Sequence, residues 1–239
     1  KNPLWYGTKP ENKEPPKISK LNEFKNSGYY VLQDGNTKTF IRCGAYKDRP
    51  YQSDNLHLDI WVDGENILRD NGSYKYNTEK QFLDYFNGAE GHNTVSVSGK
   101  NQMQKGERFI WYNWVKDAKA NLTEFQDKFI ISGKIKGFKH LHSDISHQRI
   151  VTKVKGLNEW IVKDILSGVK NKTSFQYWHF SNEIHNQLSI TSIDQKNKKL
   201  EPIIEKKWYS SYYGIKENSI RLSFKSNTNV FTTKITYRK

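Results

Sequence analysis

The sequence predicts an all-β protein, an antiparallel β-sandwich of two stacked sheets. Short segments in which apolar and polar residues alternate recur along most of the chain, and glycine and asparagine turns separate them. The clearest segment, residues 56–62, places leucine, isoleucine or valine at every second position and His57, Asp59 and Trp61 on the opposite face. No long amphipathic helix and no repeat of fixed period interrupts this pattern. Such closely spaced strands and turns favour a sandwich.

In chain order, residues 1–26 are rich in lysine, proline, glutamate and asparagine, and we expect them to form a linker. A sandwich domain is then expected over residues 27–239. One helix is expected at residues 78–86, too short to change the fold class. The expected strands are 29–33, 38–43, 56–62, 66–69, 92–97, 108–115, 118–125, 128–135, 147–154, 159–165, 174–180, 187–193, 206–213, 219–224 and 230–237.

The charge balance favours a polyanionic partner. The chain has 39 lysine and arginine residues against 25 aspartate and glutamate residues, a net charge of +14. Nucleic acid, an anionic membrane surface and an acidic polysaccharide all fit that balance. The lysines are scattered, and no nucleic-acid motif, phosphate-binding glycine loop or zinc-type cysteine pair is present, so we expect no nucleic acid. No apolar run reaches the roughly 18 residues that span a bilayer. The chain begins at Lys1, which suggests a fragment or processed product.

Polar side chains gather around the predicted hairpin that Asp63-Gly64 closes. Asp70 and His92 both stand at strand ends, where loops can bring side chains together, and their donor atoms suit a divalent ion such as zinc. The segment before Leu56 offers Gln52 as a third group, a poor zinc ligand that can hydrogen-bond a carboxylate or a sugar hydroxyl. The alternative is that Asp70 caps a turn and His92 is an ordinary hydrogen-bonded residue.

One long run resembles the C-terminal β-sandwich domain of the heparinase II/III family: SDNLHLDIWVDGENILRDNGSYKYN, followed by HNTV and by NQMQKGERFIWYNW. The resemblance extends from about Ser27 to the C-terminus. Members of the family are polysaccharide lyases in which a helical toroid precedes the sandwich, and this chain does not contain a toroid. The resemblance therefore implies two partners: an acidic, glycosaminoglycan-like polysaccharide and a missing N-terminal helical domain.

The resemblance also implies site residues. Asp70 and His92 match two metal-binding positions of characterised lyases, whereas Gln52 stands where a histidine is usual. Zinc or another divalent cation is therefore expected to bind weakly or not at all. The expected catalytic or cleft-lining residues are Tyr74, Tyr76 and His92, and the expected substrate-binding residues are Gln52, Asn55, Tyr85 and Asn93. A tyrosine can act as general base and acid when cationic neighbours lower its pKa, although in these lyases the principal base comes from the toroid. The alternative for the tyrosines is aromatic packing across strands.

Other histidines are weaker candidates. His140, His142 and His147, together with Asp144, either bind a metal or lie in a surface turn, and the surface turn is favoured. His179 lies in an aromatic strand and is expected to be packed and hydrogen-bonded.

The favoured function is thus the sandwich portion of a lyase that cleaves a uronic-acid polysaccharide by β-elimination, with the isolated chain nearly inactive. The alternative is a non-catalytic carbohydrate-binding or polysaccharide-assembly module, which Gln52 and the missing toroid favour. The sequence leaves the compartment open between bacterial periplasm and cytoplasm.

Overall fold

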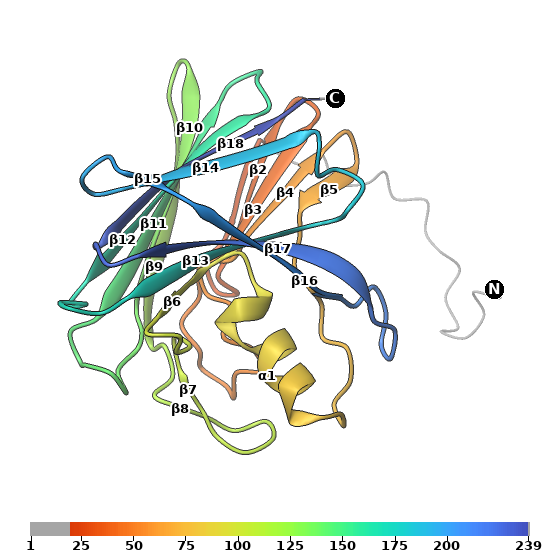
Figure 1. The fold of residues 1–239 in the computed structure, drawn as a ribbon. Coiled ribbons are helices and arrows are strands. Elements are labelled where there is room, and N and C mark those ends of the chain that lie inside the picture. The colour runs from red at the N-terminus through yellow and green to blue at the C-terminus, as the bar shows by residue number, and fades with distance from the viewer. Residues whose placement is uncertain (1–19, 239) are drawn as a thin grey trace, which may run out of the picture.

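The computed structural model of the protein describes residues 20–238. Three antiparallel sheets contain most of the strands among these residues (Figure 1). A five-stranded sheet keeps chain order: β1 (Leu21–Phe24), β2 (Tyr29–Asp34), β3 (Thr37–Arg42), β4 (Leu58–Val62) and β5 (Glu65–Leu68). A seven-stranded sheet has the order β15 (Lys199–Leu200), β14 (Leu188–Asp194), β18 (Val230–Tyr237), β12 (Glu159–Ser167), β11 (Ser146–Val154), β10 (Lys128–Lys136) and β9 (Asp117–Glu124).

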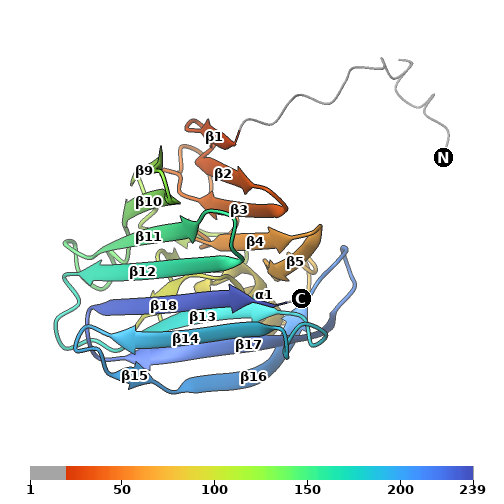
Figure 2. The ribbon, with the colours of Figure 1, turned by 90° about the horizontal axis from the view of Figure 1, so that it is seen from above.

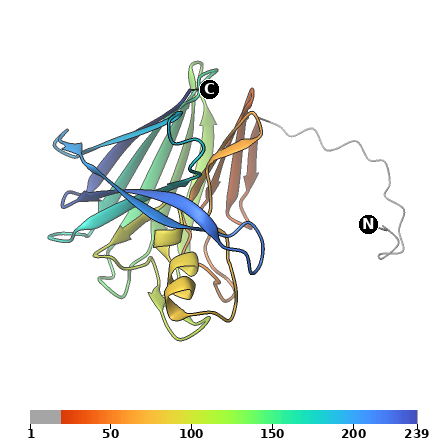
Figure 3. The same ribbon diagram turned by 45° about the vertical axis from the view of Figure 1, so that its right-hand side comes forward.

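The remaining elements lie near the end of the molecule that carries the helix. A four-stranded sheet has the order β16 (Pro202–Tyr209), β17 (Glu217–Ser226), β13 (Ser174–Phe180) and β6 (Val95–Val97). Helix α1 (Lys80–Asn87) and the 3₁₀ turn η2 (Ala89–Gly91) lead from β5 to β6, and the short strands β7 (Gln104–Lys105) and β8 (Trp111–Tyr112) pair with each other. Figure 3 shows α1 below the strands of the four-stranded sheet.

Side chains of the seven-stranded sheet form hydrogen bonds to both other sheets, which makes the fold a sandwich. Figure 2 shows the sheets from above. The indole N–H of Trp160 on β12 donates to the Thr39 hydroxyl on β3 at 2.9 Å, and the Gln176 amide on β13 donates to Asp164 on β12 at 2.7 Å. One continuous cluster of buried apolar residues fills the space between the sheets. The predicted all-β antiparallel sandwich is therefore confirmed.

The hairpin of β4 and β5 forms as its sequence predicts. Leu58, Ile60 and Val62 are buried while Trp61 between them is exposed, so the period of two places one face on the core. Asp63 (φ 51°) and Gly64 (φ 81°) both take the positive φ that a two-residue hairpin turn needs. The chain leaves β5 at Leu68 and carries Asp70 to the edge of this sheet.

Three expectations about elements differ from the structure. Residues 108–115 contribute only β8 instead of a full strand, because Arg108 (φ 48°) and Asn113 (φ 56°) adopt left-handed backbone conformations that end it. The strand expected at 206–213 ends at Tyr209. Strand β1 pairs with β2 inside the stretch predicted as linker, whereas residues 1–19 of that stretch lie outside the described residues.

Two smaller points concern the thiol and the membrane. Cys43 is buried, and burial raises the pKa of its thiol to about 11, which is consistent with an unreactive side chain. Within residues 20–238, no helix has both the length and the apolar character that crossing a membrane requires.

Candidate functional site

Two imidazoles and a carboxylate meet where the five-stranded sheet adjoins the loop before β6. His57 precedes β4, Asp70 follows β5 and His92 follows η2, and each offers a ligand atom within 4.8 Å of the others. The Nδ1 atom of His92 lies 2.7 Å from Oδ2 of Asp70, and Nε2 of His57 lies 3.8 Å from the same oxygen. Both rings are buried, whereas the Asp70 side chain keeps 36% of its surface exposed, so the group opens to solvent on the Asp70 side.

The backbone on both sides of this cluster is held from the opposite sheet. Leu56, immediately before His57, has a φ of 61°, which is unusual for a leucine and needs support from its surroundings. Arg149 on β11 supplies that support: its Nη1 donates to the Leu56 carbonyl at 2.7 Å and also to the carbonyl of Asn93, the residue after His92. The positions of both imidazoles thus depend on one buried guanidinium.

The His92–Asp70 contact is a charge-assisted pair. Burial alone would raise the pKa of the Asp70 carboxyl, but the charge of His92 and the hydrogen bond to it lower that pKa overall. Burial alone would lower the pKa of His92, and the neighbouring Asp70 carboxylate reverses this and raises it. The second Asp70 oxygen accepts the Gly72 backbone N–H at 2.7 Å, which fixes the carboxylate plane.

The cluster matches a zinc site in its donor types. Two imidazoles and one carboxylate are a donor set that zinc accepts, and the Nε2 atoms of His57 and His92 are buried without a hydrogen-bond partner among the described residues. One contact weakens the match. The Asn93 backbone N–H donates to Nδ1 of His57 at 3.0 Å, so the neutral His57 ring carries its proton on Nε2. For Nε2 of His57 to bind a metal, that nitrogen must lose its proton. If the proton moves to Nδ1, the hydrogen bond from the Asn93 backbone N–H to Nδ1 is lost.

Gln52 has a different place from the one expected. Its amide nitrogen donates to the Phe86 carbonyl at 3.1 Å and points to the Gly72 carbonyl at 3.4 Å, so it ties α1 to the loop after Asp70. His57, which the alternation pattern assigned to the polar face of a strand, is the side chain that joins Asp70 and His92 instead. Weak metal binding is expected from the sequence because residue 52 is a glutamine. In the structure, the reason to expect weak binding is instead the hydrogen bond from the Asn93 backbone N–H to His57.

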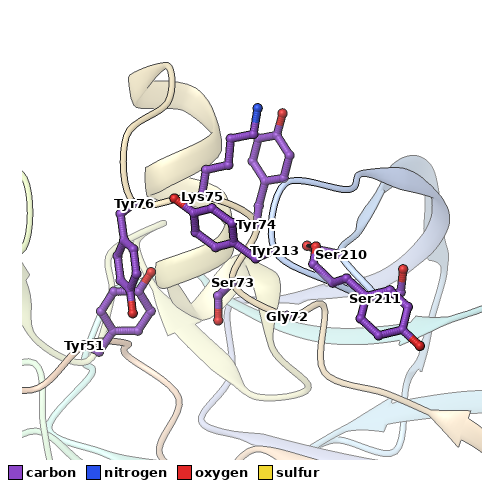
Figure 4. A pocket seen from close by; sticks show the side chains of 10 residues that line it. Tyr51, Gly72, Ser73, Tyr74, Lys75, Tyr76, Ser210, Ser211 and Tyr213 are labelled. Atoms are coloured by element: carbon purple, nitrogen blue, oxygen red, sulfur yellow. Dashed lines mark hydrogen bonds between the residues drawn. The ribbon is translucent and has the colours of Figure 1, made fainter. Parts of the chain in front are cut away.

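A pocket lined mainly by tyrosines adjoins the cluster (Figure 4). It has a volume of about 380 Å³ and lies between the loop 72–76 and the loop 210–213. The two loops are joined by backbone hydrogen bonds from Ser210 N–H to the Asn71 carbonyl and from Gly214 N–H to the Tyr74 carbonyl. Gly72 lines this pocket and donates to Asp70, so pocket and cluster share a wall.

The tyrosines of the pocket are not equivalent. Tyr76 is 58% exposed and its ring lies 5.7 Å from that of Tyr51 and 5.8 Å from that of Tyr213, so it projects into the opening (Figure 4). Tyr74 packs on Phe82 and on α1, and the ammonium groups of Lys75 and Lys216 lie 5.3 and 5.5 Å from its ring centre. Neither residue is in a strand, and Tyr74 has a φ of 60°.

Three of the four expected substrate-binding side chains are buried. Asn93 donates to the Leu58 and Arg69 carbonyls and accepts from the His179 backbone N–H. Asn55 accepts the Gly44 backbone N–H at 2.8 Å. The Tyr85 hydroxyl accepts from the Asn71 amide and lies 3.2 Å from the Trp208 carbonyl. These side chains hold the framework around the site and do not face its opening.

The remaining histidines do not form a second cluster in the described part of the chain. His142 lies in a turn with its side chain 59% exposed and 3.8 Å from Asp144. His147 instead bonds Asp164 inside the sandwich at 2.7 Å. His179 is buried and bonds Asn93, so it is packed and hydrogen-bonded as expected.

Comparison with known proteins identifies the fold family. The sequence model described as "Heparinase II/III-like, C-terminal" matches residues 16–238. The chain belongs to this family. A curated relative of this heparinase II/III-like domain, "Heparin-sulfate lyase" of Bacteroides stercoris, is 29% identical over 85 residues, which is 33% of this chain and 13% of the relative.

Solved structures agree with the heparinase II/III-like fold. A heparan sulfate lyase from Pedobacter heparinus matches with a TM-score of 0.75 and 15% identity over 95% of this chain and 37% of its own. A heparinase III gene product matches with a TM-score of 0.73 and 17% identity over 92% of this chain and 36% of its own. At these identities the likeness shows the fold. The chain spans little more than a third of the length of these solved relatives.

Proposed function

We propose that this chain is the β-sandwich portion of a polysaccharide lyase that cleaves its substrate by β-elimination next to a uronic acid. The observation that supports the proposal is the tyrosine pocket, which shares a wall with the His57–Asp70–His92 cluster in a fold belonging to the heparinase II/III-like family. The relatives whose names specify a substrate act on heparin or heparan sulfate, so we further propose an acidic polysaccharide of that class.

β-Elimination needs a base for the proton beside the carboxylate and a donor for the departing sugar oxygen. Tyr76 is an exposed tyrosine of the pocket, as are Tyr212 and Tyr213, and can contact a sugar directly. Tyr74 lines the same pocket, and the ammonium groups of Lys75 and Lys216 lie 5.3 and 5.5 Å from its ring centre. His92, hydrogen-bonded to Asp70, can hold a proton in the cluster that adjoins the pocket through Gly72. A divalent ion bound by His57, Asp70 and His92 would supply a positive charge that orients anionic groups.

A binding module without catalytic activity is the second candidate. It is favoured by the burial of Asn55, Tyr85 and Asn93, which leaves Tyr76 as the most exposed of the expected site residues. Stacking on Tyr76 and Tyr213 would hold a sugar without transforming it.

The test uses the longest natural form of the protein with heparan sulfate, and follows the absorbance of the unsaturated sugar ends that elimination creates. A direct role for Tyr76 predicts that Tyr76→Phe lowers kcat by about 100-fold or more. The matched control is Tyr29→Phe, an exposed tyrosine on β2 outside both pocket and cluster, which should leave kcat unchanged. Saccharide binding without unsaturated ends would reject the lyase and leave the binding module.

The metal is tested separately by measuring zinc content and zinc affinity of the wild type and of three alanine variants, at His57, Asp70 and His92. Weak stoichiometric binding that each substitution abolishes would support the three-residue site. A Gln52→Ala variant that binds zinc like the wild type would agree with the contacts of Gln52 to backbone carbonyls. No zinc in the wild type would mean that the three side chains serve only as a hydrogen-bonded group.

A further inference from the structure

A second and larger hollow lies on the other side of α1. It has a volume of about 870 Å³, and its walls come from α1, the loop before β7, the turn around His140 and the end of β16. Four lysines line it against two acidic residues, namely Lys80, Lys100, Lys105 and Lys207 against Asp84 and Glu90. We call this the lysine hollow.

Ion pairs already use most of the charges in the lysine hollow. Lys80 pairs with Asp84, and Lys207 pairs with Glu205 at 3.2 Å. Glu90 pairs with Arg221 at 2.8 Å. Lys100 and Lys105 form no ion pair with any residue between 20 and 238, so the unmatched charge of the hollow is positive.

Lys105 is in an unusual position for an unmatched ammonium group. Its Nζ is buried and finds no hydrogen-bond acceptor in the described part of the chain, and the ring centre of Trp111 lies 4.5 Å away. Burial lowers the pKa of this lysine. Nδ1 of His140, another wall residue, is also buried without a partner. Removing an ammonium from water without a counter-ion is unfavourable, and an anion in the hollow would offset that cost.

We propose that the lysine hollow binds an anionic saccharide unit, with Lys105 and Lys100 pairing with its carboxylate or sulfate group. Trp208 offers an aromatic wall, and the amides of Asn101 and Gln104 line the same hollow as partners for sugar hydroxyls. This inference rests on the proposed function, because it assigns part of the polysaccharide to a site separated from the tyrosine pocket by α1. A nucleic acid is disfavoured since it needs a continuous basic track, whereas Asp84 and Glu90 interrupt this one.

The experiment measures binding to the protein by calorimetry at low salt, using a size-defined heparan sulfate octasaccharide and its desulfated counterpart. Lys105→Met keeps most of the length of the side chain and removes its ammonium group, and Lys100→Ala removes the exposed ammonium group. Each should weaken octasaccharide binding about tenfold, the effect of losing one charge-assisted hydrogen bond. The control is Lys163→Ala, an exposed lysine on β12 that lines neither pocket, and binding should be unchanged. If the wild type binds the desulfated octasaccharide much more weakly than the sulfated one, the lysines pair with sulfate groups. If it binds both equally, the lysines pair with carboxylate groups.

Stability separates a binding role from a structural one. Without saccharide, Lys105→Met should unfold at a higher urea concentration than the wild type because an unpaired buried charge has been removed. A variant that loses binding and stability together would overturn the inference, as would tighter binding of a single-stranded oligonucleotide of equal charge. Unchanged octasaccharide binding by both lysine variants, with unsaturated products still formed, would overturn the inference and leave the lyase. Weakened binding without any unsaturated product would keep the inference and reject the lyase.

Discussion

Replacing Asp164 with asparagine should remove about 3–5 kcal/mol of unfolding free energy, although the two side chains have nearly the same shape. The Asp164 carboxylate is fully buried and accepts four hydrogen bonds: from His147 at 2.7 Å, from Nε and Nη2 of Arg149 at 2.8 Å each, and from Gln176 at 2.7 Å. Asparagine would leave the buried guanidinium without a counter-charge. It would also direct an N–H₂ group at one of these donors.

Urea unfolding measured by tryptophan fluorescence checks this value. The slope of the transition should stay constant while the midpoint falls, and the melting temperature should drop by about 10 °C for a domain of this size. The control is Asp117→Asn, since Asp117 and Lys136 lie 3.4 Å apart with side chains 44% and 60% exposed, and such exposed pairs contribute under about 1 kcal/mol. A loss below about 1 kcal/mol for Asp164→Asn would refute the reasoning that the charge network is needed to keep Arg149 in place.

Three further outcomes follow from the contacts around the site. Gly72→Ala should destabilise the protein by more than Gly64→Ala, measured by urea unfolding, because both glycines have φ of 81° but only the Cβ of residue 72 would meet the Ser210 carbonyl, at 2.3 Å. Burial lowers the pKa of His179 well below its usual range, so the unfolded chain binds a proton that the folded chain does not, and stability falls as the pH drops below about 6.5. His179→Gln should therefore reduce the pH dependence of the unfolding free energy, measured by urea unfolding, by up to about 1.4 kcal/mol per pH unit. Tyr85→Phe should cost about 1–2 kcal/mol in urea unfolding, since its buried hydroxyl serves the framework.

Local sequence predicts the strands and the hairpin well because their causes are local. The alternation through β4 and the Asp63-Gly64 turn depend on neighbouring residues alone, and both appear as expected. The same alternation placed His57 on the polar face of a strand. In the structure His57 lies before β4 and is buried, and the left-handed backbone of Leu56 that precedes it is supported by Arg149, 93 residues away. No local pattern contains that information.

Some of the expected site residues meet in the structure and others are buried in the framework, for a similar reason. Asp70 and His92 were predicted from their places at strand ends, and the structure brings them within 2.7 Å. Asn55 and Asn93 have side chains suited to sugar recognition, but backbone groups from distant segments bond their amide oxygens inside the protein. Whether a polar side chain faces a ligand or the interior depends on packing between the sheets, which the amino-acid types do not specify.

The reach of Arg149 from β11 to the Leu56 and Asn93 carbonyls has a consequence for the kinetics of folding. In the sequence, Arg149 is separated from Leu56 by 93 positions and from Asn93 by 56 positions. Its hydrogen bonds to them therefore form only after the two layers have docked. The imidazole cluster should then be among the last features to appear during refolding. In the folded protein, the backbone N–H of Asn93 should exchange its hydrogen with solvent only when the whole domain unfolds.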